Sequence, residues 1–477
     1  MKYLGVHLDN SLKFETHVNE KIKSARKALY AARSKVKGAF GPHPRSLKWV
    51  YEGVALPIVT YACHLWWHKA KRETLQSFNR QGCLLIAPVL DHSPTEPLEI
   101  LYDIKPLNLL TEKMALEKYL NVRDTFSRVW TGRDKGGNFC EKSHMHRCES
   151  LLAKYGLDNV ILDDKKDICL RRTYEVILNP SPIKEKGIIM YTDGSKSEEG
   201  TGYGFLCEDD GHEANGALRD EATVFQAEIM ALKKAAERLI RRELSGEMIT
   251  VYSDSKAGLM AMLSRKTSSK LVHETKVKWN HVGTRNEVEL RWIKAHAGHE
   301  GNERADELAK EGHKCALNET YTPKSWVKRF LNEKLREKWA KQWLATKVTQ
   351  YRHTKMWIPN IDLPQVKGLL QINNRKTVGL IAQWITSFNN LNYHTHRKHH
   401  KEFPNVNKAC RLCQKKTTEE TSWHLATECD RTANAARLHL HKFTQDHKSW
   451  TWESLRAFIT SPMIFKLVTT REKLPGE

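Results

Sequence analysis

Two aspartates that each follow a predicted strand most constrain the fold of this chain. The apolar run at 188–191 predicts a buried strand, which Asp193 ends. A second predicted strand ends at Asp254, and the chain reaches it through a helix expected over about 222–243. A right-handed β-α-β crossover makes these two strands parallel. Both carboxylates are therefore expected at one edge of a sheet, where open α/β sheets bind ligands.

The segment around these strands is predicted to form one α/β domain. Two further strands are expected at 202–208 and 213–219, before the helix. A last strand at 288–293 precedes a helix that begins near Gly301. The predicted order, βββαβααβα, is typical of an α/β domain, which we place at 184–318.

Two more carboxylates are expected beside the aspartates. Glu228 lies next to the apolar stripe of the 222–243 helix, where a carboxylate that faces the sheet is costly unless it is paired or bound to metal. Asp306 lies early in the last helix. Taken singly, each aspartate is a turn residue or a helix cap. Four converging carboxylates instead predict hard divalent cations, Mg²⁺ first, and two such ions can clamp a phosphoryl displacement.

Four motifs in this segment resemble the signature motifs of type I ribonuclease H, in the same order and spacing. They are Tyr191-Thr192-Asp193-Gly194-Ser195, Gln226-Ala227-Glu228, Ser253-Asp254-Ser255 and Lys294-Ala295-His296-Ala297-Gly298-His299-Glu300-Gly301-Asn302-Glu303-Arg304-Ala305-Asp306. The resemblance implies endonucleolytic cleavage of the RNA strand of RNA–DNA hybrids, which leaves 3′-hydroxyl and 5′-phosphate ends. It also implies that two Mg²⁺ ions, or Mn²⁺ in their place, are bound by Asp193, Glu228, Asp254 and Asp306.

His296 is the fifth candidate site residue. The resemblance implies that it assists proton transfer or product release. A histidine in a glycine-flanked loop beside an acidic site also suits proton shuttling. His299 is more simply a structural residue of the same loop.

The segment departs from the cellular members of this family where the hybrid is expected to bind. Val224 and Phe225 stand where those enzymes carry asparagines before the helix glutamate, and Lys256 stands in place of a glutamine. The region 264–270 is too short for the basic handle helix that some members use to grip the hybrid. We therefore expect hybrid affinity to depend on neighbouring domains.

Three of the ten cysteines cluster with a histidine near the C-terminus. The spacing C-x2-C-x10-H-x4-C suits a tetrahedral Zn²⁺ ion, and four protein ligands make such a site structural. The predicted ligands are Cys410, Cys413, His424 and Cys429. The alternative is a metal-free turn with buried thiols. A second group has too compressed a spacing and is more simply a solvated linker: Cys140, His144, His146 and Cys148.

The N-terminal segment resembles the last palm motif and the thumb of reverse transcriptases from non-LTR retrotransposons. The matching residues are Lys2-Tyr3-Leu4-Gly5-Val6-His7-Leu8-Asp9, an amphipathic helix after them, and Leu56-Pro57-Ile58-Val59-Thr60-Tyr61. Followed by a ribonuclease H domain and a CCHC zinc knuckle, this motif implies the C-terminal part of such a polyprotein. The paired aspartates of a polymerase site are absent in that context, so no polymerase activity is expected.

The predicted fold class is α/β, a ribonuclease H-like mixed sheet flanked by helices, between a helical N-terminal region and a helical, zinc-knuckle C-terminal region. The predicted layout is a palm-end and thumb-like remnant at 1–125, a linker at 126–183, the ribonuclease H domain at 184–318, a basic tryptophan-rich helical region at 319–405, the zinc knuckle at 406–435 and a helical tail at 436–477.

The charge of the chain predicts a polyanionic partner. Seventy-eight Lys and Arg against 56 Asp and Glu give a net charge of +22. We expect an RNA–DNA hybrid, RNA or DNA as the partner. The chain has no apolar run near 18 residues, so no membrane span is expected, and its sparse cysteines indicate a reduced intracellular protein, nuclear or cytoplasmic.

Two alternatives to an active hydrolase stay open at this point. One is a catalytically weak or inactive nucleic-acid-binding remnant of a retrotransposon polyprotein. The other is a protein–protein module whose interface is the tryptophan-rich helical segment 326–347, although the basic charge argues against it.

Overall fold

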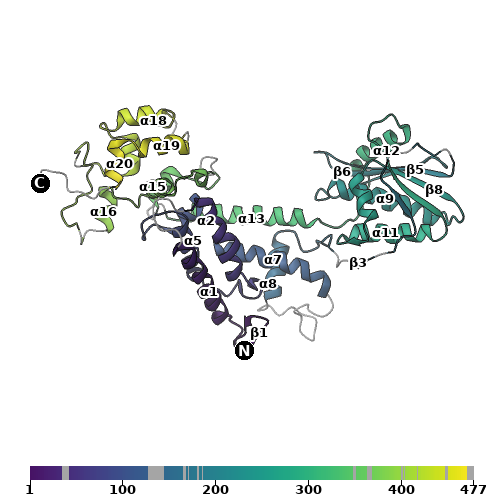
Figure 1. Ribbon diagram of the computed structural model, residues 1–477, viewed down its shortest axis with the longest axis horizontal. Coiled ribbons are helices and arrows are strands. Elements are labelled where there is room, and N and C mark those ends of the chain that lie inside the picture. Colours follow the sequence, from purple (N-terminus) through teal and green to yellow (C-terminus); the bar gives the residue numbers. More distant parts are fainter. Residues whose placement is uncertain are drawn as a thin grey trace. The chain divides into compact units, whose positions relative to one another are not determined.

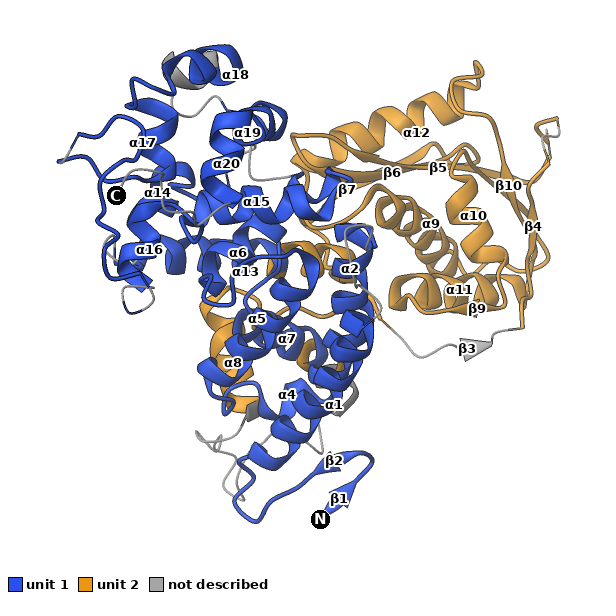
Figure 2. Cartoon of the chain, turned by 60° about the vertical axis from the view of Figure 1, so that its left-hand side comes forward, with its two compact units in different colours: residues 1–118, 332–477 blue, residues 119–331 orange. Residues whose placement is uncertain are grey.

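The computed structural model divides into two compact units (Figure 2). Unit 1 comprises Met1–Lys118 and Asn332–Glu477, and unit 2 comprises Tyr119–Leu331. None of the helices that the structure describes is long and apolar enough to cross a membrane. The structure describes residues 1–34, 42–126, 144–164, 168–169, 171–179, 182–184, 186–347, 351–362, 368–398, 401, 403–415, 417–445 and 450–469.

Unit 2 is built around a mixed sheet, of which β5, β6 and β8 are labelled in Figure 1. The sheet has six strands in the order β4-β10-β8-β5-β6-β7. Its strands are β4 (Glu175–Ile177), β5 (Ile188–Lys196), β6 (Thr201–Cys207), β7 (His212–Leu218), β8 (Met248–Ser253) and β10 (Glu287–Trp292). Its other elements are α8 (His144–Lys154), β3 (Ile168–Cys169), α9 (Val224–Arg241), α10 (Lys256–Leu263), β9 (Lys266–Thr267), α11 (Lys270–Gly283), α12 (Glu300–Glu311) and the 3-10 turn η2 (Gly312–Lys314).

The alternation of side chains along β5 explains the layers of the domain. Ile188 and Met190 belong to the core that also holds the apolar side chains of α9 and α11. Ile189 and Tyr191 point to the other face and share a smaller core with Ala305 of α12. Because successive strand residues face opposite sides, α9 and α11 cover one face of the sheet and α12 covers the other (Figure 2).

The expected order βββαβααβα is confirmed for the segment from β5 to α12, apart from the two-residue strand β9. Strand β5 is antiparallel to β6 and parallel to β8, and β8 is parallel to β10. A mixed sheet flanked by helices is the ribonuclease H-like α/β arrangement that was predicted.

Residues upstream of this segment also contribute to unit 2. Strand β4 pairs in parallel with β10 and makes a sixth strand at the edge, although its residues fall in the predicted linker. Strand β3 pairs with β9, and Leu162 forms a parallel bridge with Thr322. The sheet and its helices therefore include residues between 161 and 178.

Unit 1 is mainly helical (Figure 1). Helices α7 (Leu107–Phe126) and α13 (Lys324–Ala345) each cross the boundary between the units. The N-terminal part holds β1 (Lys2–Tyr3), β2 (Val6–His7), α1 (Glu15–Ser34), α2 (Pro44–Val50), the π-helical turn η1 (Tyr51–Ala55), α3 (Leu56–Val59), α4 (Cys63–Trp66), α5 (Arg72–Ile86) and α6 (Thr95–Tyr102). The C-terminal part holds α14 (Arg352–Trp357), η4 (Leu369–Gln371), α15 (Arg375–Thr386), α16 (Asn392–Lys398), α17 (Ser422–Thr427), α18 (Ala433–Gln445), α19 (Trp452–Ile459) and α20 (Pro462–Thr469).

A single hydrophobic core joins the two parts of unit 1. The core includes the buried stripe of α1, with Val18, Ile22 and Leu29, and it also includes Trp384 of α15 and Phe458 of α19. The N-terminal and C-terminal regions, which the sequence analysis treats as separate, therefore form one compact unit.

Candidate active site

The parallel pairing of β5 and β8 brings the two aspartates together. The last residue pair of this ladder is Thr192 with Ser253, so Asp193 and Asp254 directly follow it on adjacent strands. Strand β5 itself runs on to Lys196 because its residues continue to pair with β6. The prediction that Asp193 ends its strand was therefore wrong. The aspartate lies at the edge of the ladder because β8 stops there.

Glu228 completes a tight group of carboxylates. Oxygen atoms of Asp193, Glu228 and Asp254 all lie within 4.8 Å of one another. Asp193 and Glu228 are buried, and Asp254 is half-buried. Three of the four predicted carboxylates thus meet at one point of unit 2.

The close approach of α9 to β5 depends on Gly194. A Cβ atom at this position would lie 2.3 Å from the backbone nitrogen of Glu228, so a side chain would push the helix away from the strand. A capping box fixes the first turn of the helix, because Thr223 Oγ1 accepts from the Gln226 backbone N–H and Gln226 Oε1 accepts from the Thr223 backbone N–H, each at 3.2 Å. Glycine and cap together position Glu228 over Asp193.

Asp306 stands beside this group on α12. A Cβ atom at Gly204 of β6 would lie 2.6 Å from the backbone nitrogen of Ala309, so this glycine lets α12 lie close to the sheet. The Asp306 carboxylate interacts with that of Asp193, while its Oδ2 atom lies 2.6 Å from Lys310 Nζ. The fourth predicted carboxylate therefore borders the cluster and already carries a lysine partner.

The three clustered carboxyls disfavour their own charged forms. Burial, and after it the charge of Asp254, raise the pKa of Asp193 to about 7. Burial and then the charge of Asp193 raise the pKa of Glu228 well above its ordinary value. Burial likewise raises the pKa of Asp254. Burial and mutual repulsion thus make the fully charged cluster unfavourable unless a cation is bound between the carboxylates.

A divalent cation fits this group of residues. The Oε2 atom of Glu228 is buried and has no hydrogen-bond partner among the described residues. An unsatisfied buried carboxylate oxygen is costly, and a hard cation with oxygen ligands satisfies it. The donor set of Asp193, Glu228 and Asp254 is all carboxylate, as Mg²⁺ prefers.

The loop before α12 brings His296 toward Asp254. His296 is exposed and has a left-handed backbone conformation with φ of 51°. Burial is the largest cause of the raised pKa of Asp254, and the charge of His296 acts against it. Asn302, a buried residue of the same motif that the sequence reasoning did not single out, also lowers the pKa of Asp254 through a side-chain hydrogen bond.

The positions that depart from the cellular enzymes lie near the carboxylates in the sequence, at the start of α9 and of α10. Val224, the first residue of α9, is 49% exposed, and Phe225 packs against the core of unit 2. Lys256 Nζ lies 5.2 Å from the centroid of the Trp292 ring. Some members of the family carry a basic handle helix in the region 264–270. In this chain the region holds β9, which pairs with β3 from the upstream segment.

The predicted zinc ligands also meet, in unit 1. Their ligand atoms lie within 4.8 Å of one another, with 4.0 Å between the Sγ atoms of Cys410 and Cys429, and 3.5 Å between Cys413 Sγ and His424 Nε2. Nδ1 of His424 lies 3.3 Å from a carboxylate oxygen of Glu428, which leaves Nε2 to face the thiols. Burial raises the pKa of Cys410 to about 12, so its thiolate needs a neighbouring cation. Cys140 of the alternative cysteine–histidine group lies outside the described residues.

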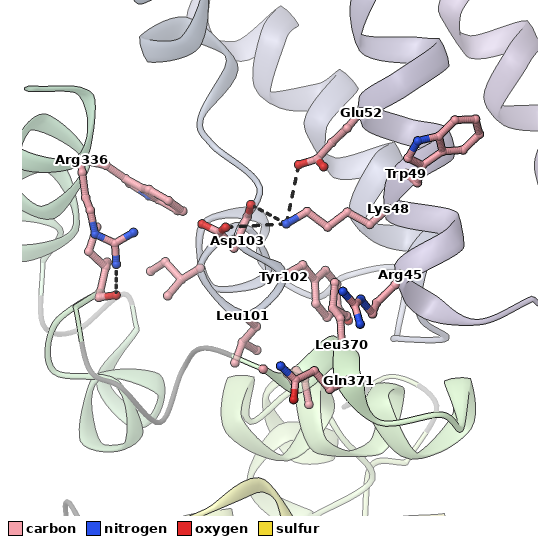
Figure 3. A pocket seen from close by; sticks show the side chains of 15 residues that line it. Arg45, Lys48, Trp49, Glu52, Leu101, Tyr102, Asp103, Arg336, Leu370 and Gln371 are labelled. Atoms are coloured by element: carbon pink, nitrogen blue, oxygen red, sulfur yellow. Dashed lines mark hydrogen bonds and ion pairs between the residues drawn. The ribbon is translucent and has the colours of Figure 1, made fainter. Parts of the chain in front are cut away.

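A separate pocket of about 620 Å³ lies in unit 1 (Figure 3). Lys48 Nζ lies 3.6 Å from Glu52 and 3.7 Å from Asp103, and Arg336 pairs with Asp362 at 2.5 Å. The described residues that line it include none of the predicted site residues. Its charges are thus largely balanced within the protein, in contrast to the carboxylate cluster.

The mixed sheet, with carboxylates at the edge where the pairing of two parallel strands ends, defines a ribonuclease H-like nuclease domain. Residues 185–314 match the family model described as RNase H. The ribonuclease H of Francisella philomiragia subsp. philomiragia is 34% identical over 142 residues, which cover 26% of this chain and 90% of that protein. The ribonuclease H of Maricaulis maris is 35% identical over 138 residues, which cover 26% of this chain and 92% of that protein. The chain belongs to the ribonuclease H family and is a hydrolase that acts on RNA–DNA hybrids.

Proposed function

We propose that unit 2 cuts the RNA strand of RNA–DNA hybrids endonucleolytically, with two divalent cations held by Asp193, Glu228, Asp254 and Asp306. The observation that carries this proposal is the cluster of three carboxylates within 4.8 Å, one of which has a buried oxygen without a partner among the described residues. Mg²⁺ is the expected ion, with Mn²⁺ as a substitute.

Each residue has a role that its position supports. When bound, two such ions would supply an activated water and stabilise the leaving oxygen of the phosphodiester. Asp193 and Glu228 are buried, so the surrounding residues fix the positions of their carboxylates before substrate binds. His296 is exposed on the loop beside Asp254, where it can move a proton at the leaving group without losing contact with solvent. Asn302 orients Asp254 by its hydrogen bond.

The test is cleavage of a hybrid labelled on its RNA strand, by the full chain, with and without added Mg²⁺. Mg²⁺ is omitted rather than chelated, so that the cysteine–histidine group keeps any metal it binds. The variants are Asp254→Asn and, as a matched control, Glu247→Gln, an exposed carboxylate in the same unit. We expect Mg²⁺-dependent cuts that Asp254→Asn lowers by at least about 100-fold, since removal of one group that stabilises the transition state costs this much, and that Glu247→Gln leaves unchanged.

The opposite outcome has a defined meaning. Binding of the hybrid with no Mg²⁺-dependent cleavage favours the nucleic-acid-binding remnant, and Val224 and Phe225, at the start of α9, are then the first positions to change. Cleavage that Asp254→Asn leaves intact contradicts the ligand assignment.

We further propose that Cys410, Cys413, His424 and Cys429 hold a structural Zn²⁺ ion, supported by the approach of their ligand atoms within 4.8 Å. We also propose that the chain derives from the C-terminal part of a non-LTR retrotransposon polyprotein, with a palm-end and thumb-like region before the ribonuclease H domain. The sequence motif at 2–9 and the order of the domains support this origin. Nucleic acid is the proposed partner, and no polymerase activity is expected of this chain.

A further inference from the structure

A basic notch lies in unit 1, and its lining shares no residue with the cysteine–histidine group or with the pocket of Figure 3. Helix α14 contributes Arg352 and His353 to its lining, and helix α16 contributes Tyr393, Arg397 and Lys398. The end of α15 closes its third side. The described residues that line it include no acidic side chain.

The cationic side chains at its mouth have no acidic partners among the described residues. Arg352, Arg397 and Lys398 are exposed, and none of them forms an ion pair with that part of the chain. The Glu419 carboxylate interacts electrostatically with His353, but it also lies 3.6 Å from Lys408 Nζ, which offsets its charge. Three positive charges around one hollow repel each other, so an anion between them would lower the electrostatic energy.

His353 lies at the base of the notch and is only 8% exposed. Its ring stands edge-on to that of Tyr393, with 4.5 Å between centroids. Neither ring nitrogen has a hydrogen-bond partner among the described residues. A buried N–H without an acceptor is costly, and a ligand oxygen in the notch would satisfy it.

The size of the notch limits what can enter. Its enclosed volume is about 20 Å³, which is room for one water-sized group, while its mouth is open to solvent. A whole nucleotide or coenzyme does not fit. One oxygen of a tetrahedral anion does fit, with the other oxygens at the mouth among the arginines.

We propose that this notch binds a single backbone phosphate of a nucleic acid strand. One phosphate oxygen accepts a hydrogen bond from the His353 ring, and Arg352, Arg397 and Lys398 contact the others. A nucleic acid is favoured over a free phosphate because the chain carries a net charge of +22, which attracts a polyanion far more strongly than a small ion. The notch thus gives unit 1 a strand-binding contact that is independent of the carboxylate site of unit 2.

The test measures binding of the full chain to a fluorescent single-stranded DNA of about 20 nucleotides, which offers no RNA to be cut. The variants are Arg397→Ala, the double variant Arg352→Ala/Arg397→Ala, and His353→Phe, which keeps the ring but removes its nitrogens. The matched control is Arg437→Ala, an exposed arginine on α18 in the same unit. Melting temperatures confirm that each variant is folded.

We expect Arg397→Ala to weaken binding about three- to tenfold and the double variant to lower the slope of log affinity against log salt by about 0.7, the loss of one phosphate contact on a single strand. Arg437→Ala should weaken binding less than about twofold. Equal effects of the notch variants and Arg437→Ala would overturn the proposal. So would notch variants that lose binding of inorganic phosphate, measured by calorimetry, while their affinity for DNA is unchanged. Because no Mg²⁺ or cleavage is involved, failure here is distinct from failure of the proposed nuclease site.

Discussion

Lys310 Nζ lies 2.6 Å from Asp306 Oδ2, one turn further along α12. The lysine side chain is 60% exposed and the aspartate 21%, so the ammonium reaches back from solvent to the edge of the carboxylate cluster. The ammonium takes up one of the two carboxylate oxygens of Asp306 and offsets its charge. If Asp306 helps to hold a divalent cation, as proposed, we expect Lys310 to compete with that cation for the carboxylate.

We predict that Lys310→Met lowers the Mg²⁺ concentration needed for half-maximal cleavage by up to about fivefold, since an exposed ion pair contributes roughly 0.2–1 kcal/mol. The measurement is a Mg²⁺ titration of hybrid cleavage. Lys234→Met is the control, because Lys234 also forms an ion pair within one helix turn, with Glu237 of α9 at 3.2 Å. An equal Mg²⁺ requirement in all three proteins would show that Lys310 does not compete.

The buried carboxylates predict a pH-dependent effect of Mg²⁺ on stability. Burial raises the pKa of Asp193 from 3.8 to about 7, so in the metal-free protein its contribution to stability is complete below pH 3.8 and is lost as the pH rises through 7. Mg²⁺ binds only the charged carboxylates. We therefore expect Mg²⁺ to raise the melting temperature more at about pH 8 than at about pH 6.

Calorimetry of the full chain at the two pH values checks this expectation. In the Asp193→Asn variant, the rise in melting temperature that Mg²⁺ causes should differ less between the two pH values, because one titrating ligand is removed. A Mg²⁺ effect of the same size at both pH values in the parent chain would contradict it.

Asp163 ties the upstream segment to the nuclease domain. Its Oδ1 atom accepts from Ser269 Oγ at 2.9 Å and from the Leu271 backbone N–H at 3.2 Å, and its Oδ2 accepts from Gln226 Nε2 at 3.1 Å. Asp163→Ala removes all three hydrogen bonds at once. We predict a loss of about 1–3 kcal/mol in unfolding free energy, measured by urea denaturation, because the donors are left without this acceptor.

The adjacent Asp164 provides the control for this prediction. It pairs with Lys324 at 2.6 Å, and both side chains are 30–41% exposed. Asp164→Ala should cost less than about 1 kcal/mol, as exposed ion pairs do. If both variants lose the same free energy, Asp163 is no more than a surface residue.

The cysteine–histidine group predicts the metal content of the chain. We expect the purified protein to contain about one zinc ion per molecule, and Cys429→Ser to lose most of it and to lower the melting temperature of unit 1. Elemental analysis after dialysis measures the zinc. Cys315→Ser, which changes an exposed cysteine of unit 2, should retain the ion. A parent chain without zinc supports the metal-free turn instead.

The sequence predicted the nuclease domain well because its signals are local. Strand and helix periodicity indicated β5 to α12 in the right order, and the crossover rule by itself placed Asp193 and Asp254 side by side. The reach of β5 beyond Asp193 was missed, since Gly194 looks like a turn residue in isolation. Its lack of a side chain in fact serves the contact with α9.

Local sequence patterns could not predict contacts between residues that lie far apart in the chain. Nothing in the residues around Asp163 shows that it accepts hydrogen bonds from a helix more than 100 positions away. The four residues in the spacing of a zinc site were found, because they lie close together in the sequence. The notch at His353 was not found, because its basic side chains come from two helices that are well separated along the chain.

The sequence by itself determined which chemistry this chain carries: carboxylates on adjacent strands and a crossover helix, thiols and a histidine at metal spacing, and a large basic surplus. Each follows from residue type and short-range periodicity. Only the tertiary structure decided that Lys310 neutralises Asp306, that the upstream segment adds a strand to the sheet, and that the two ends of the chain share one core. Those contacts depend on which surfaces meet after folding, and burial of apolar area selects them without leaving a local pattern in the chain.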